Sequence, residues 1–491
     1  MVLVERVLPA EPVEDLAAYV ERYEGGRALE VAKKVPAATM IEELEAAGLR
    51  GRGGAGFPTG RKWRTVAENR SEVLPATVVV NAAEGEPGTF KDRAILRANP
   101  YHVLEGALVA ARVVGADTVV FALKATFTTE LERVRRAVSE ITEAGWLDGI
   151  QVDVVEGPGE YLYGEETAML EVIAGRAPLP RIAPPYRRGV DEVVDTVADA
   201  ESESGLAAPV ELAGGAQGNV APPTLVDNVE TLANVPLLAL RGSEWFRRVG
   251  TLESPGTIVC TITGRVRHPG TAEVAMGTTL RAAIEEVGGG VEPDRTIAAL
   301  VPGVSNAFIP PDLLDTPMTY EAMEAIGSGL GSAGFIVLDD TDDLVAAAAG
   351  VSRFLAVESC GQCTPCKQDG LAMAELLAGL AASTADEHDL EDLVSRTATV
   401  GDGARCNLAL QQQAVVSGLL RRWSAPVAHH IAGRAEGHEP LLVAEIVDID
   451  EGGVAVDTTH ADKQPDWTFD DEDSGMTPVE RFTDHRDEPE S

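Results

Sequence analysis

Three cysteines lie close together in this sequence, and a fourth follows at a distance. The segment ESCGQCTPC places Cys360, Cys363 and Cys366 in the pattern C-x2-C-x2-C, and Cys406 comes much later. A cubane cluster needs four thiolates, and a tight loop can supply three of them while a distant element supplies the fourth. The spacing therefore predicts a [4Fe-4S] cluster. Zinc stays open as an alternative, although structural zinc sites usually pair their ligands in two separate short motifs, and buried free thiols are a third alternative.

A glycine-rich loop, GRGGAG at residues 51–56, fits the phosphate-binding pattern G-x-G-x-x-G. It follows an expected helix rather than a strand, so it lacks the usual dinucleotide-binding context. Its glycines nevertheless expose backbone N–H groups, and Arg52 and Lys62 add positive charge suited to a phosphate. The loop is a candidate phosphate cradle, and a flexible turn is the alternative.

Two further loops are acidic and rich in glycine, and both follow expected strands. NAAEGEPGTFKDR contains Glu84 and Glu86, and GPGEYLYGEET contains Glu165 and Glu166. Open α/β sheets bind ligands at the carboxyl ends of their strands, where these carboxylates are suited to orient ribose or amide groups. The alternative is that they cap the helices that follow, above all for Glu165 and Glu166.

The elements that must position these loops alternate between strand and helix. Helices are expected within residues 11–50, before the glycine loop. After it, we expect strands over 77–81, 118–123 and 152–156, helices over 92–114 and 130–144, and a further helix that opens at Gly164. This alternation predicts a parallel α/β sheet.

The rest of the chain changes character several times. Residues 187–223 show little periodicity and predict a long loop or insertion. From residue 257 the order strand, turn, strand, helix, strand predicts a small β-grasp-like domain. A strand over 334–340 then leads into helical sequence that carries the four cysteines. Residues 425–491 are acidic and broken by Gly and Pro, with one expected hairpin around Gly452-Gly453, and we expect most of this tail to be mobile.

Composition narrows the class of protein. The chain has 491 residues, is 45% hydrophobic and has a formal net charge of −39, so nucleic acid and anionic lipid surfaces are not expected partners. No apolar run approaches the ~20 residues of a membrane span, and no signal pattern opens the sequence, so we expect a soluble cytoplasmic protein. Its five cysteines do not form a secreted disulfide framework, and Cys260, within an apolar strand, is expected to pack in a core.

Taken together, five segments resemble, in order, the signatures of one family. They are RGRGGAGFPTGRKW, NAAEGEPGTFKDR, YLYGEETAML, VDNVETLANVP and ESCGQCTPC. The sequence is similar over roughly residues 20–425 to the flavin-bearing, NADH-oxidising F subunit of respiratory complex I and to the diaphorase subunits of NAD-linked hydrogenases and formate dehydrogenases.

The resemblance implies an α/β plus α architecture: a Rossmann-like FMN domain (1–245), a small β-grasp, SLBB-like domain (250–332), a helical bundle with a [4Fe-4S] cluster (333–425) and an acidic tail (426–491). It also implies that NADH gives a hydride to FMN, that electrons leave singly through the cluster, and that other redox subunits of a complex receive them. Such a subunit is cytoplasmic and meets the inner face of the cell membrane only through its partners.

The resemblance also assigns roles by position. Glu86 and Glu166 would be catalytic. The cluster would be bound by Cys360, Cys363, Cys366 and Cys406. The residues implied to hold FMN are Gly51, Arg52, Gly53, Lys62, Asn81, Glu84, Gly164, Asn228 and Thr231. Those implied to place NADH are Gly54, Phe57, Glu86, Tyr161 and Glu166, and Glu165 also belongs to the implied cofactor site.

The sequence departs from the family pattern mainly on the nicotinamide side. Ala83 replaces an acidic residue, Thr65 an aromatic one and Ala183 a basic one, while Asp227 stands where asparagine is common and Tyr186 where phenylalanine is usual. A lost stacking or charge contact costs about 1 kcal/mol. These departures motivate one alternative, a flavin and cluster relay that takes electrons from another donor. A second alternative, from a different class, is a non-catalytic assembly subunit that keeps the cluster for structure.

Overall fold

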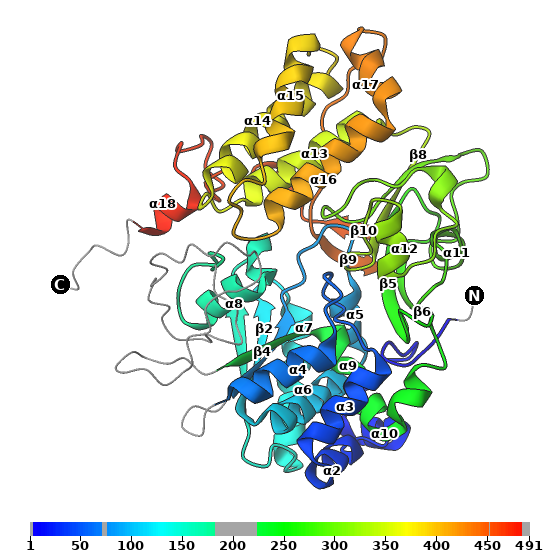
Figure 1. Cartoon of the computed structure of the whole chain (residues 1–491), viewed down its shortest axis with the longest axis vertical. Coiled ribbons are helices and arrows are strands. Elements are labelled where there is room, and N and C mark those ends of the chain that lie inside the picture. The colour runs from blue at the N-terminus through cyan, green and yellow to red at the C-terminus, as the bar shows by residue number, and fades with distance from the viewer. Residues whose placement is uncertain (1–2, 71–75, 182–222, 451, 484–491) are drawn as a thin grey trace, which may run out of the picture.

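The lower half of the molecule is built on a four-stranded parallel sheet (Figure 1). The computed structural model describes residues 3–70, 76–181, 223–450 and 452–483. The strand order is β3-β2-β1-β4 and every neighbouring pair is parallel, which confirms the predicted α/β architecture. The strands are β1 (Ala76–Ala82), β2 (Ala116–Lys124), β3 (Gln151–Gly157) and β4 (Thr224–Asn228).

Helices cover both faces of this sheet, because successive side chains of a strand point to opposite faces. Val78 and Val80 of β1 pack toward the long buried helix α6, and Val79 packs on the other face toward α8. The helices of this half are α1 (Leu16–Tyr23), α2 (Arg27–Lys34), α3 (Ala37–Ala47), α4 (Thr59–Asn69), α5 (Lys91–Ala98), α6 (Pro100–Val114), α7 (Thr128–Glu143), α8 (Glu166–Ile173), α9 (Val229–Ala233) and α10 (Val235–Phe246).

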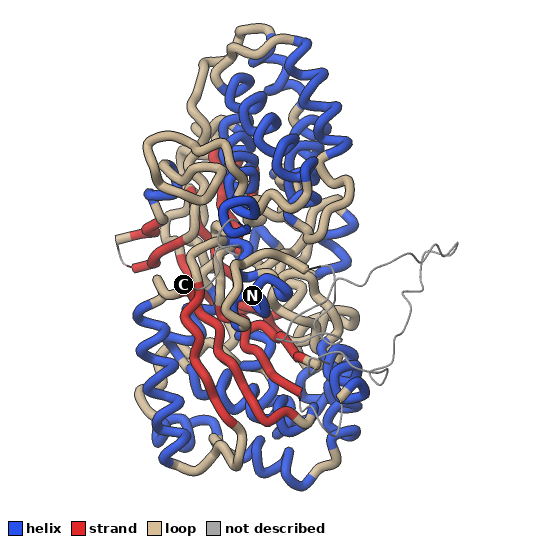
Figure 2. The backbone as a smooth tube through the Cα atoms, turned by 90° about the vertical axis from the view of Figure 1, so that its left-hand side faces the viewer, coloured by secondary structure: helices blue, strands red, loops and turns tan. Residues whose placement is uncertain are grey.

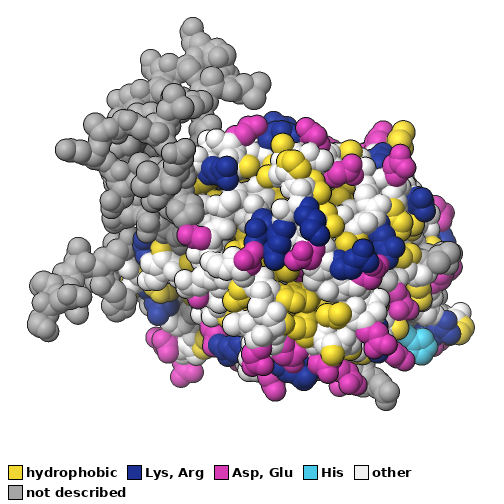
Figure 3. All heavy atoms as spheres, turned by 90° about the horizontal axis from the view of Figure 1, so that it is seen from below, with side chains coloured by type: hydrophobic (Ala, Val, Ile, Leu, Met, Phe, Trp, Pro, Cys, Tyr) yellow, Lys and Arg dark blue, Asp and Glu magenta, His cyan; other side chains and the backbone are white. Residues whose placement is uncertain are grey.

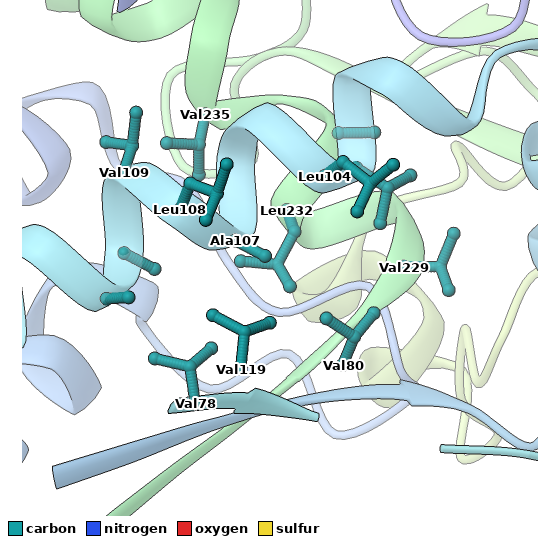
Figure 4. Close-up of a cluster of buried hydrophobic side chains, with 14 of the residues drawn as sticks. Val78, Val80, Leu104, Ala107, Leu108, Val109, Val119, Val229, Leu232 and Val235 are labelled. Carbon is teal, nitrogen blue, oxygen red and sulfur yellow. The ribbon is translucent and has the colours of Figure 1, made fainter. Parts of the chain in front are cut away.

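The centre of this core lies between β1, β2, α6 and α9 (Figure 4). Gly106 of α6 sits so close to α9 that an added Cβ would meet the carbonyl oxygen of Leu232 at 2.0 Å. The absence of a side chain therefore lets the two helices touch through their backbones. This contact fixes α9, which lies within the VDNVETLANVP segment, against the sheet.

One helix that we expected from the sequence is divided into two, α5 and α6. The helical run predicted over 92–114 breaks between Asn99 and Pro100, where Asn99 has φ −152° and ψ 79°. Proline disfavours helical backbone in the residue before it and cannot donate an N–H, so α5 ends there. Asn99 then caps α6 by accepting from the backbone N–H of His102.

A second sheet forms the β-grasp domain, and its extent differs from the prediction. The order is β6-β5-β8-β7, with β5 and β8 parallel and the other pairs antiparallel. We expected the domain to end at 332, but β8 pairs between β5 and β7 and so belongs to this sheet, because its ladder partners lie there. The elements are β5 (Thr257–Gly264), β6 (Gly270–Ala275), α11 (Leu280–Glu286), β7 (Ile297–Val301), η2 (Pro311–Leu313), α12 (Tyr320–Ala325) and β8 (Gly334–Asp339).

The upper half is a helical bundle that confirms the predicted C-terminal helical region. Figure 2 shows it above the parallel sheet. Its helices are α13 (Leu344–Glu358), α14 (Thr364–Ala381), α15 (Glu387–Thr399), α16 (Leu408–Arg422) and α17 (Ser424–Ile431). All five contribute buried apolar side chains to one core, which also contains Cys360 and Cys366. The short helix α18 (Pro478–Thr483) packs against this core through Val479 and Phe482.

The prediction that residues 426–491 are mostly mobile does not hold for residues 426–450 and 452–483. The expected hairpin is present as β9 (Ile446–Asp450) and β10 (Gly453–Val456), followed by the turn η3 (Thr458–Ala461). The acidic character suggested a solvated tail, but Asp448 pairs with Arg97 at 2.6 Å and Trp467 is 5% exposed. A charge that looked solvated thus pairs with the α/β domain, and the aromatic residue is buried.

The surface carries both signs of charge. Figure 3, which views the molecule from below, shows acidic and basic side chains interspersed with small apolar areas on that face. Within the described ranges, no helix is both long enough and apolar enough to cross a bilayer.

Candidate functional site

A cavity of about 760 Å³ opens at the carboxyl ends of β1 and β4, the edge where α/β sheets bind ligands. Its walls come from the glycine loop, the two acidic loops, the β-grasp domain and the segment around Cys406. The predicted residues on its wall are Gly53, Gly54, Asn81, Glu84, Glu86, Tyr161, Gly164, Glu165 and Asn228.

Glu84 and Glu165 both lie on the cavity wall and both cap the helix that follows them. Glu84 lines the cavity and accepts from the backbone N–H of Asp92 at 3.0 Å, in the first turn of α5. Glu165 lines it and accepts from the N–H groups of Thr167 and Ala168, which caps α8. Burial raises the pKa of Glu84 to about 8, with Asp92 adding to the effect. The caps fix both loops at the cavity edge.

Glu86 joins three parts of the chain. One of its oxygens accepts from the N–H of Val304 at 2.9 Å, and the other accepts from the Tyr161 hydroxyl at 2.5 Å. Gly303 permits this contact, since its φ is +59° and an added Cβ would lie 2.3 Å from the carboxylate. Burial raises the pKa of Glu86, and the two hydrogen bonds oppose that rise. The carboxylate and the phenol together present polar atoms to the cavity.

A buried lysine that sequence reasoning missed also lines the cavity. Lys91 is 1% exposed and its ammonium lies 2.7 Å from Asp92, 3.1 Å from Glu230 and 3.2 Å from the amide oxygen of Asn228. Burial alone would lower the pKa of Lys91, but the two carboxylates outweigh it and raise the pKa. The lysine therefore stays charged beside the cavity. Its only sequence signal was its place in the FKDR end of an acidic loop.

The side chain of Arg52 does not line this cavity, although Arg50 and Gly53 on either side of it do. The guanidinium of Arg52 donates to the carbonyls of Arg50 and Pro255, and its backbone N–H donates to Thr231 Oγ1 at 2.8 Å. Gly51, Arg52 and Thr231 are absent from the cavity wall. The positive charge expected there from Arg52 is instead buried and serves to anchor the loop, while Gly54, with φ +124°, brings backbone to the wall.

Lys62 and Glu166, two further predicted residues, belong to a polar cluster that lies off the cavity wall. Lys62 forms an ion pair with Glu166 and donates to the carbonyl of Val226. Asp227 accepts from the indole of Trp63 at 2.7 Å, and burial raises its pKa to about 6. Phe57, Lys62 and Glu166 do not line the cavity, and Phe57 is 47% exposed.

Among the departures from the family pattern, Ala83 lines the cavity and Thr65 lies on the surface of α4. Ala183 and Tyr186, and the predicted insertion at 187–223 apart from residue 223, lie outside the described residues. The cavity thus has a methyl group where the resemblance implied an acidic side chain.

The four motif cysteines line one small cavity at the base of the bundle. Cys363 precedes the first residue of α14 and Cys366 lies in its first turn, while Cys406 comes from the segment before α16. Burial raises the pKa of Cys366 to about 11 and that of Cys406 to about 12, with neighbouring cysteines adding to it. A metal centre bound there would take them as thiolates. Cys260 is fully buried in β5, as predicted for a core residue.

The thiols fit a cluster better than a single ion. A cubane gives each thiolate its own iron, so four sulfurs around one cavity suit it. The donor set also lacks the paired motifs that zinc prefers.

The two cavities share a wall. Leu162, Arg405, Cys406 and Leu408 line both of them. A ligand in the larger cavity and a cluster on the thiols would therefore be separated by little more than these side chains. The larger cavity lies within the ~300–1,000 Å³ typical of cofactor sites. Its glycine backbone and the Lys91 ammonium fit the phosphate of a cofactor such as FMN.

Comparisons with known proteins agree with this geometry. Family models match for the Nuo51 FMN-binding domain at residues 44–237, the SLBB domain at 259–303 and the NADH-ubiquinone oxidoreductase-F iron-sulfur binding region at 346–430.

Similar curated proteins include an F subunit of NADH-quinone oxidoreductase, numbered F 2, from Rhizobium meliloti (strain 1021), which is 36% identical, with 80% of this chain and 89% of the relative covered. The corresponding F subunit of Rhodobacter capsulatus is 34% identical, with 83% and 90% covered. A solved chain from the NAD+-reducing [NiFe]-hydrogenase in the H2-reduced state superposes with a TM-score of 0.71 at 30% identity, covering 85% of this chain and 66% of that one. The chain belongs to the family of NADH-quinone oxidoreductase F subunits.

Proposed function

We propose that this protein is the electron-input subunit of a multi-subunit redox complex, which oxidises NADH at FMN and passes electrons through a [4Fe-4S] cluster to a partner subunit. The observation that carries the proposal is the wall shared by the two cavities, with Cys406 lining both. Bound FMN would supply the change from two-electron to one-electron transfer. The protein's own residues position the cofactors and exclude water.

The cavity residues divide this work. Gly53, Gly54 and Lys91, which line the cavity, would hold the anionic parts of FMN, and Asn228 supports Lys91 through its amide oxygen. Glu86 and Tyr161 form a hydrogen-bonded pair suited to orient the carboxamide of a nicotinamide. Glu166, also expected to be catalytic, would act only if its ion pair with Lys62 opened.

Purification without oxygen tests the proposal. The protein should contain about one flavin and four irons per chain, consistent with one four-cysteine cluster, and NADH should reduce ferricyanide in its presence. Protein that folds but binds no flavin would contradict the proposal.

One observation favours a second candidate, a relay that takes electrons from a different donor. Ala83 lines the cavity and removes an acidic group implied by the resemblance. The two candidates separate in a stopped-flow experiment. Flavin bleaching by micromolar NADH within seconds supports NADH oxidation, whereas bleaching only by another reductant supports the relay.

A further inference from the structure

The C-terminal tail reaches a buried carboxylate that lies beside both cavities. Glu358 is the last residue of α13, two positions before Cys360, and is 2% exposed. His460 and Lys463 of the tail donate to one of its oxygens at 3.0 and 2.7 Å. None of the three family models extends past residue 430, so both tail residues lie outside them.

The other oxygen of Glu358 leads to the cofactor cavity. It accepts from the backbone N–H of Tyr161 at 3.1 Å, and the Tyr161 hydroxyl donates to Glu86 at 2.5 Å. A continuous set of contacts therefore runs from the tail to the cavity wall. Both oxygens of Glu358 are therefore engaged, one by the two tail residues and the other by the backbone of Tyr161.

A second contact links the same partners independently. The ring of Phe354 stacks on His460, with centroids 4.7 Å apart, and meets the Tyr161 ring edge-on at 5.3 Å. Phe354 is 3% exposed and lies one turn before Glu358 on α13. Tyr161 is thus held through its backbone by a carboxylate and through its ring by an aromatic stack, and His460 contacts both supports.

The tail itself is anchored on the same helix. Arg353 donates to the carbonyls of His460 and Ala461, and the Trp467 indole donates to the carbonyl of Val357 at 3.0 Å. The preceding hairpin is attached elsewhere, to α5, through Asp448 and Arg97. The chain around the hairpin also contacts the α/β domain through Arg93 and Lys124, whereas the attachment on α13 reaches Tyr161 itself through Glu358.

We propose that residues 460–467 act as a positioning clamp for the cofactor cavity: His460 and Lys463 fix Glu358, which fixes Tyr161 and so aims its hydroxyl at Glu86. The clamp rests on the proposed function of that cavity. His460 and Lys463 are positioning residues, since neither lines the cavity. The ligand whose binding they control is the nicotinamide that Tyr161 and Glu86 would orient.

Lys463→Met in the full-length, cofactor-loaded protein tests the clamp. Asp448→Asn, which breaks the contact of the hairpin with α5, is the matched control. Amide exchange of the peptide that contains Tyr161, measured without NADH, should accelerate about ten-fold in K463M because its acceptor loses a charged partner. KM for NADH should rise about ten-fold while kcat changes little, since a misaimed group loses binding first. Flavin and iron content should match the wild type.

Lys463→Arg should restore both values, and D448N should stay within about two-fold of the wild type. If K463M does not fold, His460→Leu gives the same test, because it removes both the N–H donor to Glu358 and the ring that stacks on Phe354. Wild-type exchange at Tyr161 in these variants, or equal acceleration in D448N, would overturn the clamp. Wild-type protein that fails to oxidise NADH would reject the proposed function instead, and would leave the exchange result to decide the clamp.

Discussion

The two adjoining cavities are assembled in opposite ways. The thiol cavity takes three of its cysteines from one short loop and only Cys406 from elsewhere. The cofactor cavity collects its wall from the glycine loop, both acidic loops, the β-grasp domain and the segment before α16. A site built from one short segment can therefore be recognised in the sequence as a motif. A site built by tertiary packing can be recognised only in the folded structure, where distant side chains come together.

The largest effect is expected where the two cavities meet. Cys406→Ser should lower bound iron at least ten-fold, because losing one thiolate removes a corner of the cluster and metal affinity falls steeply with each ligand lost. Flavin content, measured on the same sample, should persist. Cys260→Ser, in the core of β5, is the control and should keep its iron. Equal iron in C406S and the wild type would show that the cysteines do not form one site.

Removing the buried cation from the cofactor cavity comes next. Lys91→Met leaves Asp92 buried without its cation and Glu230 with only Arg52 at 3.8 Å, and breaking such a buried pair costs about 3–5 kcal/mol. Thermal unfolding should show this loss directly, and FMN binding should weaken in parallel. A variant with wild-type stability would mean that the two carboxylates are protonated at neutral pH.

A smaller effect on NADH oxidation is expected from Glu86, which lines the cofactor cavity, and a still smaller one from Glu166, which does not. Glu86→Gln should lower kcat/KM for NADH by about ten- to a hundred-fold, the effect of a lost charged hydrogen bond of roughly 1.5–3 kcal/mol. Glu166→Gln, whose carboxylate pairs with Lys62, should change it only a few-fold. The comparison fails if E166Q is the more damaging variant.

The off-wall cluster also gives a pH-dependent prediction. Burial raises the pKa of Asp227 to about 6, so the folded state favours the neutral acid. The stability that this provides is present below the unfolded pKa of about 4 and is lost as pH rises through about 6. Asp227→Asn should therefore raise the free energy of unfolding by about 2 kcal/mol at about pH 8 and have little effect at about pH 4. Denaturant titrations at both pH values measure the difference, and an equal shift at both would contradict it.

The smallest effect is expected at Phe57. Its ring is half exposed and lies off the cavity wall, next to Arg61. Phe57→Ala should change KM for NADH by less than about two-fold, as for an ordinary surface substitution. A much larger rise in KM would place the ring against bound NADH and would extend the cavity beyond its present wall.

The parallel sheet, the β-grasp domain and the bundle could be predicted because strand and helix periodicities are local. The strand β4 was missed, because its polar end Asp227-Asn228 resembles a loop until β1 pairs with it. The strand β8 was placed with the bundle, since nothing in the strand itself identifies its pairing partners. The tail was misjudged because charge composition does not show that Asp448 and Lys463 have partners in other domains.

Among the site residues, glycines and capping carboxylates were predictable from motif and position. The burial of Lys91 was not, because a lysine in a polar loop looks solvated until Asp92 and Glu230 surround it. Arg52 shows the converse error. Its charge suggested a phosphate ligand, but its side chain points into the protein and anchors the loop.

The wall shared by Leu162, Arg405, Cys406 and Leu408 also limits how such a protein can evolve. A substitution at any of these positions affects both cavities at once. A change that suits a new electron donor must therefore leave the thiol cavity intact. Substitutions that adapt the protein to a different donor should therefore accumulate in the glycine loop and the β-grasp domain, on the opposite side of the cofactor cavity. The shared wall should change more slowly.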